Sequence, residues 1–192
     1  MESGTRFFWV LIAALLGASV FFGLNAESRR RAVQASETTL ANGSIVFVDR
    51  IVDGDTLLVH DEAKNPVVVR LLGIKALPVQ PERDPASRFG RAAIDELGRL
   101  TENQPLRVLL HDTTRDRHGR TLAELFVGQD DLGLELVKRG LALAYTVYPF
   151  PSLPLYIQEQ EEARADRRGL WNDQQVARKA DLLIAKWGRE EP

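Results

Sequence analysis

The sequence predicts an α+β domain that is mainly β: a closed barrel of five short strands with about three helices packed on it. A membrane-spanning helix is expected before the barrel and an extra helix after it. Three observations lead to this prediction. Short runs of branched apolar residues recur between turn residues, a helix-period segment follows the third run, and more such segments follow the last. This order is typical of the OB-fold barrel.

The expected strands are short apolar runs bounded by polar turn residues. Asp53-Gly54-Asp55 separates the first two runs and Asn65-Pro66 precedes the third. Such pairs favour turns because Asp and Asn bond their own backbone and glycine accepts a left-handed conformation. The five expected strands cover residues 44–52, 56–60, 67–74, 106–111 and 121–127.

The expected helices carry apolar residues at helical spacing and end at recognisable caps. Gly140 and Gly169 stand where a left-handed residue usually closes a helix, and Asp173 stands where an acceptor side chain opens one. The expected helices cover residues 88–100, 132–139, 155–168 and 173–187.

Composition places the chain among ordinary folded proteins. Of its 192 residues 44% are hydrophobic and 27% charged, which excludes a disordered or fibrous chain. Cysteine is absent, so neither a disulfide framework nor a thiolate site contributes. The net charge of −2 does not suit a protein that coats nucleic acid, so any phosphate site must be local.

Residues 7–26 predict a membrane-spanning helix. The segment contains no charged residue, and its length suits a helix that crosses about 30 Å of hydrocarbon. The arginines at 29–31 favour a cytoplasmic domain, since positive residues tend to stay on that side. A secreted or periplasmic domain remains the alternative, because residues 24–26 resemble a signal-peptide cleavage site. We expect an anchor or uncleaved signal at 1–26, joined by a polar linker at 27–43.

Five motifs follow one another along the chain. They are 52–56 (VDGDT), 69–74 (VRLLGI), 116–123 (DRHGRTLA), 136–142 (LVKRGLA) and the segment from 163–164 (AR) to 169–171 (GLW). In this order and spacing they resemble the staphylococcal nuclease (thermonuclease) family. The resemblance covers about residues 44–171 and leaves 172–192 as a C-terminal helical extension.

The resemblance implies an OB-fold domain that binds single-stranded or frayed DNA and RNA and hydrolyses phosphodiester bonds with calcium. Arg70 and Arg120 stand where the family keeps two catalytic arginines. Two guanidinium groups facing a phosphate stabilise the negative charge that gathers on its oxygens during attack by water. Asp55 stands at the position of a calcium-binding carboxylate, and calcium prefers such oxygen ligands.

The resemblance also implies a substrate pocket. Arg117 and His118 replace a basic and aromatic pair that contacts the nucleotide, and Tyr145 and Tyr148 fall near the family's pocket tyrosines. Packing of the two tyrosines between barrel and final helix is the alternative. By composition alone, residues 116–120 also suit a solvated hairpin loop.

Arg70 has a second interpretation. An arginine inside an apolar strand is costly unless it meets an anion or a carboxylate. A buried ion pair with Asp55 or Glu124 is therefore the alternative to phosphate binding.

The sequence departs from the family at two positions. Lys75 stands where the family has its second calcium ligand, and an ammonium group repels calcium. Pro78 stands at the position of the proposed general base, and loss of such a base costs on the order of a hundredfold to ten-thousandfold in rate. We therefore expect calcium binding and hydrolysis to be weakened or lost.

Two arrangements would compensate. Glu82 follows Pro78 by four residues and is a candidate substitute base, whereas Lys75 itself would face the phosphate while paired to Asp55. Without either, the domain is expected to be a non-catalytic module for nucleic acid or phosphate, or a membrane-tethered scaffold for a protein that the sequence does not identify.

Overall fold

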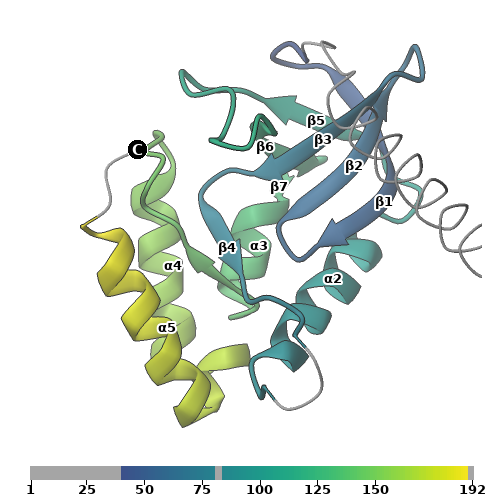
Figure 1. The fold of residues 1–192 in the computed structure, drawn as a ribbon. Coiled ribbons are helices and arrows are strands. Elements are labelled where there is room, and N and C mark those ends of the chain that lie inside the picture. The colour runs from purple at the N-terminus through teal and green to yellow at the C-terminus, as the bar shows by residue number, and fades with distance from the viewer. Residues whose placement is uncertain (1–39, 81–83, 190–192) are drawn as a thin grey trace, which may run out of the picture. The chain divides into compact units, whose positions relative to one another are not determined.

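A computed structural model describes residues 40–80 and 84–189 (Figure 1). One sheet has the strand order β3-β2-β1-β5-β6-β7, and an additional pairing of β3 with β6 closes its first five strands into a barrel. The expected OB-like barrel is therefore confirmed. Its strands are β1 (Ile45–Asp53), β2 (Thr56–Asp61), β3 (Pro66–Leu71), β5 (Leu106–Leu109) and β6 (Thr121–Val127), extended by β7 (Asp130–Asp131).

Local sequence explains the first hairpin and tertiary pairing explains the closure. The Asp-Gly turn joins β1 to β2 with Asp53 opposite Thr56. The closing pair is parallel and aligns Val69 with Thr121 and Arg70 with Leu122. Closure therefore brings the motif around Arg70 beside the motif that ends at the start of β6.

The single strand expected at 67–74 is wrong, because the chain divides there into β3 and β4 (Ile74–Ala76). Gly73 makes the break with φ +77°, and a Cβ at Gly73 would lie 2.4 Å from the Phe150 ring. Only glycine suits that backbone and that approach. Strand β4 then leaves the barrel and pairs with β8 (Ala142–Ala144) in a separate two-stranded sheet, with Lys75 opposite Leu143.

The described residues contain four α-helices and a short 3-10 helix. Asp173 opens α5 by accepting the N–H groups of Gln175 and Val176, as expected, and Asp131 opens α3 in the same way through Gly133 and Leu134. Burial raises the pKa of Asp131 to about 6, although its hydrogen bond from Tyr156 acts in the opposite direction. The helices are α2 (Ser87–Thr101), α3 (Leu132–Lys138), α4 (Leu153–Ala165), η1 (Gly169–Asn172) and α5 (Gln174–Trp187).

The expected end of α4 at Gly169 is wrong. The helix ends at Ala165, and Arg167 takes the left-handed conformation with φ +55°. The N–H groups of Arg167 and Arg168 then close the last turn on the carbonyls of Arg164 and Ala163. Gly169 instead opens η1, the 3-10 helix.

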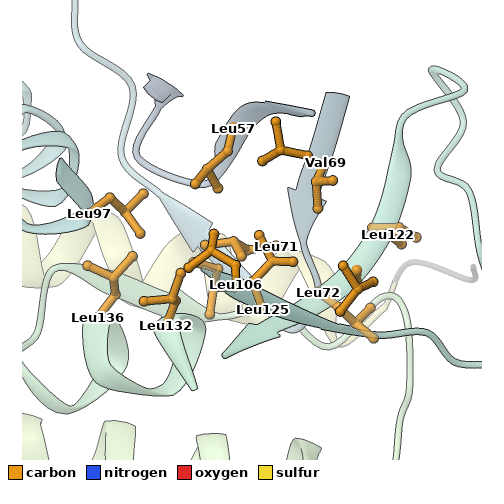
Figure 2. Packing of buried hydrophobic residues seen from close by; sticks show 14 of the residues in the cluster. Leu57, Val69, Leu71, Leu72, Leu97, Leu106, Leu122, Leu125, Leu132 and Leu136 are labelled. Carbon is orange, nitrogen blue, oxygen red and sulfur yellow. The ribbon is translucent and has the colours of Figure 1, made fainter. Parts of the chain in front are cut away.

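Two clusters of buried apolar residues hold the domain together. Figure 2 shows the larger one, in which barrel residues such as Leu57 and Leu125 meet Leu97 of α2 and Leu136 of α3. The smaller one lies where α2, β8, α4 and α5 meet, and it includes Trp171 and Trp187.

The folded unit begins before Ser44, where the sequence pattern changes. Leu40 is buried in the larger cluster, and the Gly43 N–H donates to the Val108 carbonyl. The last residues of the expected linker therefore belong to the domain. The expected membrane segment, 7–26, lies outside the described residues, and no helix within those residues has the length and apolar composition to cross a membrane.

Candidate functional site

A pocket of about 110 Å³ gathers seven of the residues proposed from the sequence. We call it the cationic pocket, because four arginine or lysine side chains and one aspartate line it. Parallel pairing of β3 with β6 brings Arg70 beside Arg120, and pairing of β4 with β8 brings Lys75 beside the segment that leads to Tyr145. Its lining residues are Arg70, Lys75, Asp116, Arg117, His118, Arg120, Tyr145 and Tyr148.

Arg70 lines the pocket and also donates hydrogen bonds to backbone carbonyls. Its guanidinium donates to the carbonyls of Leu71 (2.9 Å) and Ile74 (2.6 Å), so it holds the turn between β3 and β4. Its Nη1 also lies 3.4 Å from Asp55 Oδ1, with both side chains buried. The buried ion pair with Asp55 that the sequence suggested is therefore present, and Arg70 also lines the pocket. Glu124, the other proposed partner, contacts His111 instead.

Asp55 lies behind the pocket and is 1% exposed. Its Oδ2 accepts hydrogen bonds from Lys75 Nζ and from the Ala76 N–H, both at 3.0 Å, and its Oδ1 accepts one from Thr56 Oγ1. Burial would raise the pKa of Asp55, but the charges of Arg70 and Lys75 outweigh burial and lower it. Asp55 is therefore a carboxylate neutralised by the protein's own cations.

Arg120 is held by groups from strand β2 and from the turn before β6. Its Nε donates to Asp116 Oδ2 at 2.7 Å, and its Nη1 donates to Thr56 Oγ1 at 3.1 Å. Asp116 also accepts the N–H groups of His118 and Arg120, which explains the tight turn of this motif. Burial acts to raise the pKa of Asp116, but these hydrogen bonds lower it. The guanidinium of Arg120 is thus fixed in direction, with a quarter of the side chain exposed.

The remaining pocket residues form its outer wall. Arg117 and His118 are exposed at the tip of the turn, with Arg117 Nε 3.4 Å from His118 Nε2. Tyr145 and Tyr148 are half-buried, with their ring centroids 5.9 Å apart. Both tyrosines also pack against the smaller core cluster, in agreement with the packing alternative proposed from the sequence.

Two residues of this network were not proposed as site residues. Thr56 bridges Asp55 and Arg120, and Asp116 holds Arg120 in place. Thr56 lies in the motif at 52–56 and Asp116 in the motif at 116–123. An aspartate shortly before a glycine often accepts backbone N–H groups of the turn, so the role of Asp116 in the turn could have been predicted. Thr56 orients Arg120 from 64 residues away in the chain and Asp116 does so from 4 residues away, so the first contact depends on the tertiary fold.

Lys75 and Asp55 also line a second cleft of about 310 Å³, together with Pro78. Pro78, at the position of the expected base, offers this cleft no side-chain proton acceptor. Glu82, the proposed substitute, lies outside the described residues.

The part of the chain that contains the pocket is similar to a known protein family. A family profile described as staphylococcal nuclease homologue matches residues 68–173. This chain belongs to the staphylococcal nuclease family. The match begins in β3, two residues before Arg70, and includes every residue that lines the cationic pocket.

Curated relatives extend the similarity. An uncharacterized endonuclease of Haemophilus influenzae is 35% identical over 75% of this chain and 72% of its own length. A thermonuclease of Staphylococcus intermedius is 28% identical over 70% of this chain and 80% of its own. A micrococcal nuclease of Shigella flexneri is 36% identical over 66% of this chain and 72% of its own length.

The residues present do not fit the calcium ion that the family resemblance implies. The Lys75 ammonium lies 3.0 Å from Asp55 Oδ2, and a calcium ion bound to that oxygen would need a distance of 2.3–2.6 Å. Lone pairs that a metal would use already accept hydrogen bonds from Thr56 and Ala76. Within residues 40–80 and 84–189, no three His, Asp or Glu side chains are grouped as a metal site requires.

Proposed function

We propose that this domain binds phosphodiester groups of nucleic acid in the cationic pocket without hydrolysing them by a calcium-dependent route. The ion pair between Lys75 and Asp55 is the observation that carries the proposal, because it places a protein cation where a metal would be needed. Pro78, at the position where the family has its proposed general base, has no side-chain proton acceptor with which to activate water.

The charge of the pocket supports binding. Arg70, Lys75, Arg117 and Arg120 face a space that, among the described residues, only Asp116 lines with negative charge. A phosphate there would receive charge-assisted hydrogen bonds, each about twice as strong as a neutral one.

The geometry also suits binding with little reorganisation. Arg120 is already oriented by Asp116 and Thr56, and Lys75 is oriented by Asp55. Lys75 is 40% exposed, so its ammonium can contact a phosphate without leaving Asp55.

The test measures binding and cleavage separately. We would titrate the purified full chain into fluorescein-labelled single-stranded DNA and RNA and follow anisotropy, with calcium or chelator, while gels record cleavage. Arg120→Ala removes a pocket cation, and Arg178→Ala removes an exposed arginine of α5 outside the pocket. We expect Arg120→Ala to weaken binding about 10–100-fold and to reduce the salt slope by about 0.7.

Each outcome has a definite meaning. Binding lost in Arg120→Ala and kept in Arg178→Ala, with no cleavage in calcium, supports the proposal. Calcium-dependent cleavage that Arg120→Ala abolishes would show that the family reaction persists. Equal binding by both variants, or no binding at all, would favour the protein scaffold.

We also propose that residues 7–26 tether the domain to a membrane as a single-pass anchor, with the domain on the cytoplasmic side. The uncharged apolar run and the arginines at 29–31 support this proposal. Retention of the full chain in membranes after alkaline carbonate extraction is expected, and its release would refute the anchor. Protease protection in sealed vesicles distinguishes the two sides.

A further inference from the structure

Helix α5 lies beyond the residues that the family profile matches, and it is firmly attached to the domain. Ion pairs join Asp173 to Arg88 (2.7 Å) and Lys179 to Asp84 (2.6 Å), at the start and middle of the helix. Its apolar face is buried in the smaller cluster. Figure 1 shows α5 alongside α4, and a third ion pair, Arg164 to Asp181 at 3.0 Å, links these two helices. The helix is therefore held in one orientation relative to β8.

The last residue of α5 contacts a wall of the cationic pocket. Trp187 is 8% exposed, and its ring centroid lies 4.9 Å from that of Tyr145, with the ring planes at 85°. Aromatic pairs favour this edge-to-face geometry, because the positive edge of one ring meets the negative face of the other. Tyr145 lines the pocket and Trp187 does not.

Backbone and ring contacts both hold Tyr145. Its N–H donates to the Gly73 carbonyl at 2.8 Å, which fixes the backbone beside the sheet of β4 and β8. Its ring lies 5.8 Å from the Arg70 guanidinium, and Trp187 covers another part of the ring. The backbone bond does not fix the side-chain torsions, and the ring contacts with Arg70 and Trp187 help to hold the rotamer.

We infer that Trp187 is a positioning residue that holds the Tyr145 ring as a preformed wall for the nucleoside attached to the bound phosphate. This inference depends on the proposed function. Tyr145 carries no charge, so the wall should affect a ligand with a base and sugar more than it affects phosphate alone. The C-terminal extension thus contributes to ligand selectivity as well as to stability.

The test compares two ligands and three variants of the full chain. Trp187→Ala removes the contact, Trp187→Phe retains an aromatic ring, and Val176→Ala loosens the buried first turn of the same helix away from the pocket. We expect Trp187→Ala to weaken binding of a thymidine oligonucleotide about 5–20-fold and inorganic phosphate less than twofold. Trp187→Phe should recover most of the affinity, and Val176→Ala should lower the melting temperature without changing the ratio of the two affinities.

Several results would overturn the inference. Equal losses for both ligands, or the same change in ratio for Val176→Ala, would assign Trp187 a purely structural role. Failure of the unaltered chain to bind either ligand would instead refute the proposed function. If Trp187→Ala does not fold, the chain labelled with 5-fluorotryptophan gives a second measurement. The fluorine signal of Trp187 should shift on adding oligonucleotide while that of Trp171 stays in place, and an unchanged Trp187 signal would refute the contact's role.

Discussion

Replacing Lys75 by aspartate should create a calcium site beside Asp55. In the structure the Lys75 ammonium lies 3.0 Å from Asp55 Oδ2, in the space that a bound cation would need. Lys75→Asp removes that cation and adds a carboxylate, which changes the local charge by −2. Without metal the variant should be less stable by about 2 kcal/mol, because Asp55 loses one of its two cationic partners and gains a like charge.

The expected gain with calcium follows from mass action. With a dissociation constant of about 1 mM, which is common for modest calcium sites, 10 mM calcium would stabilise the variant by about 1.4 kcal/mol. For a chain of this size that corresponds to about 3–6 °C in melting temperature. The unaltered chain should show no comparable shift, because its ammonium would have to leave Asp55 first.

Thermal unfolding followed by circular dichroism, in calcium and in chelator, measures both the loss of stability without metal and the gain with calcium. Lys75→Met is the matched control, since it removes the ammonium and adds no ligand, and it should respond to calcium less than Lys75→Asp does. A calcium shift in the unaltered chain as large as that in Lys75→Asp would refute the argument that Lys75 excludes the metal.

Three further predictions concern the same domain. The double variant Lys75→Asp/Pro78→Glu should acquire calcium-dependent cleavage of single-stranded DNA in a gel assay, and continued inactivity would show that ligand and base are not the missing parts. Arg70→Met should destabilise the domain by about 3–5 kcal/mol in urea unfolding, because Asp55 stays buried with less compensation; a loss below about 1 kcal/mol would contradict this. Burial raises the pKa of Asp131 to about 6, so the folded state holds a proton that the unfolded state loses above about pH 4. The stability that this group contributes therefore falls as pH rises from about 4 to about 6. The free energy of unfolding of Asp131→Asn should exceed that of the unaltered chain by up to about 3 kcal/mol at pH 7.5 and by little at pH 4. A difference that does not change with pH would contradict this prediction.

Local sequence determined much of this protein. The Asp-Gly turn and the apolar runs around it predicted the first hairpin, and Asp173 with the helical spacing after it predicted α5 at nearly its observed bounds. The residue types at 75 and 78 also showed that the calcium and base positions differ from the family pattern. These features are local, because a turn, a helix cap and the chemistry of a side chain depend on neighbours within a few residues.

Tertiary structure decided how those residues act. The run at 67–74 looks continuous in sequence because nearly all of its residues are buried. The break at Gly73 depends on the approach of Phe150, which is distant in sequence. Arg70 meets Asp55 across 15 residues, and Trp187 meets Tyr145 across 42. These contacts exist because the barrel closes through β3 and β6 and because α5 docks on the small cluster, and no periodicity within one segment encodes either event.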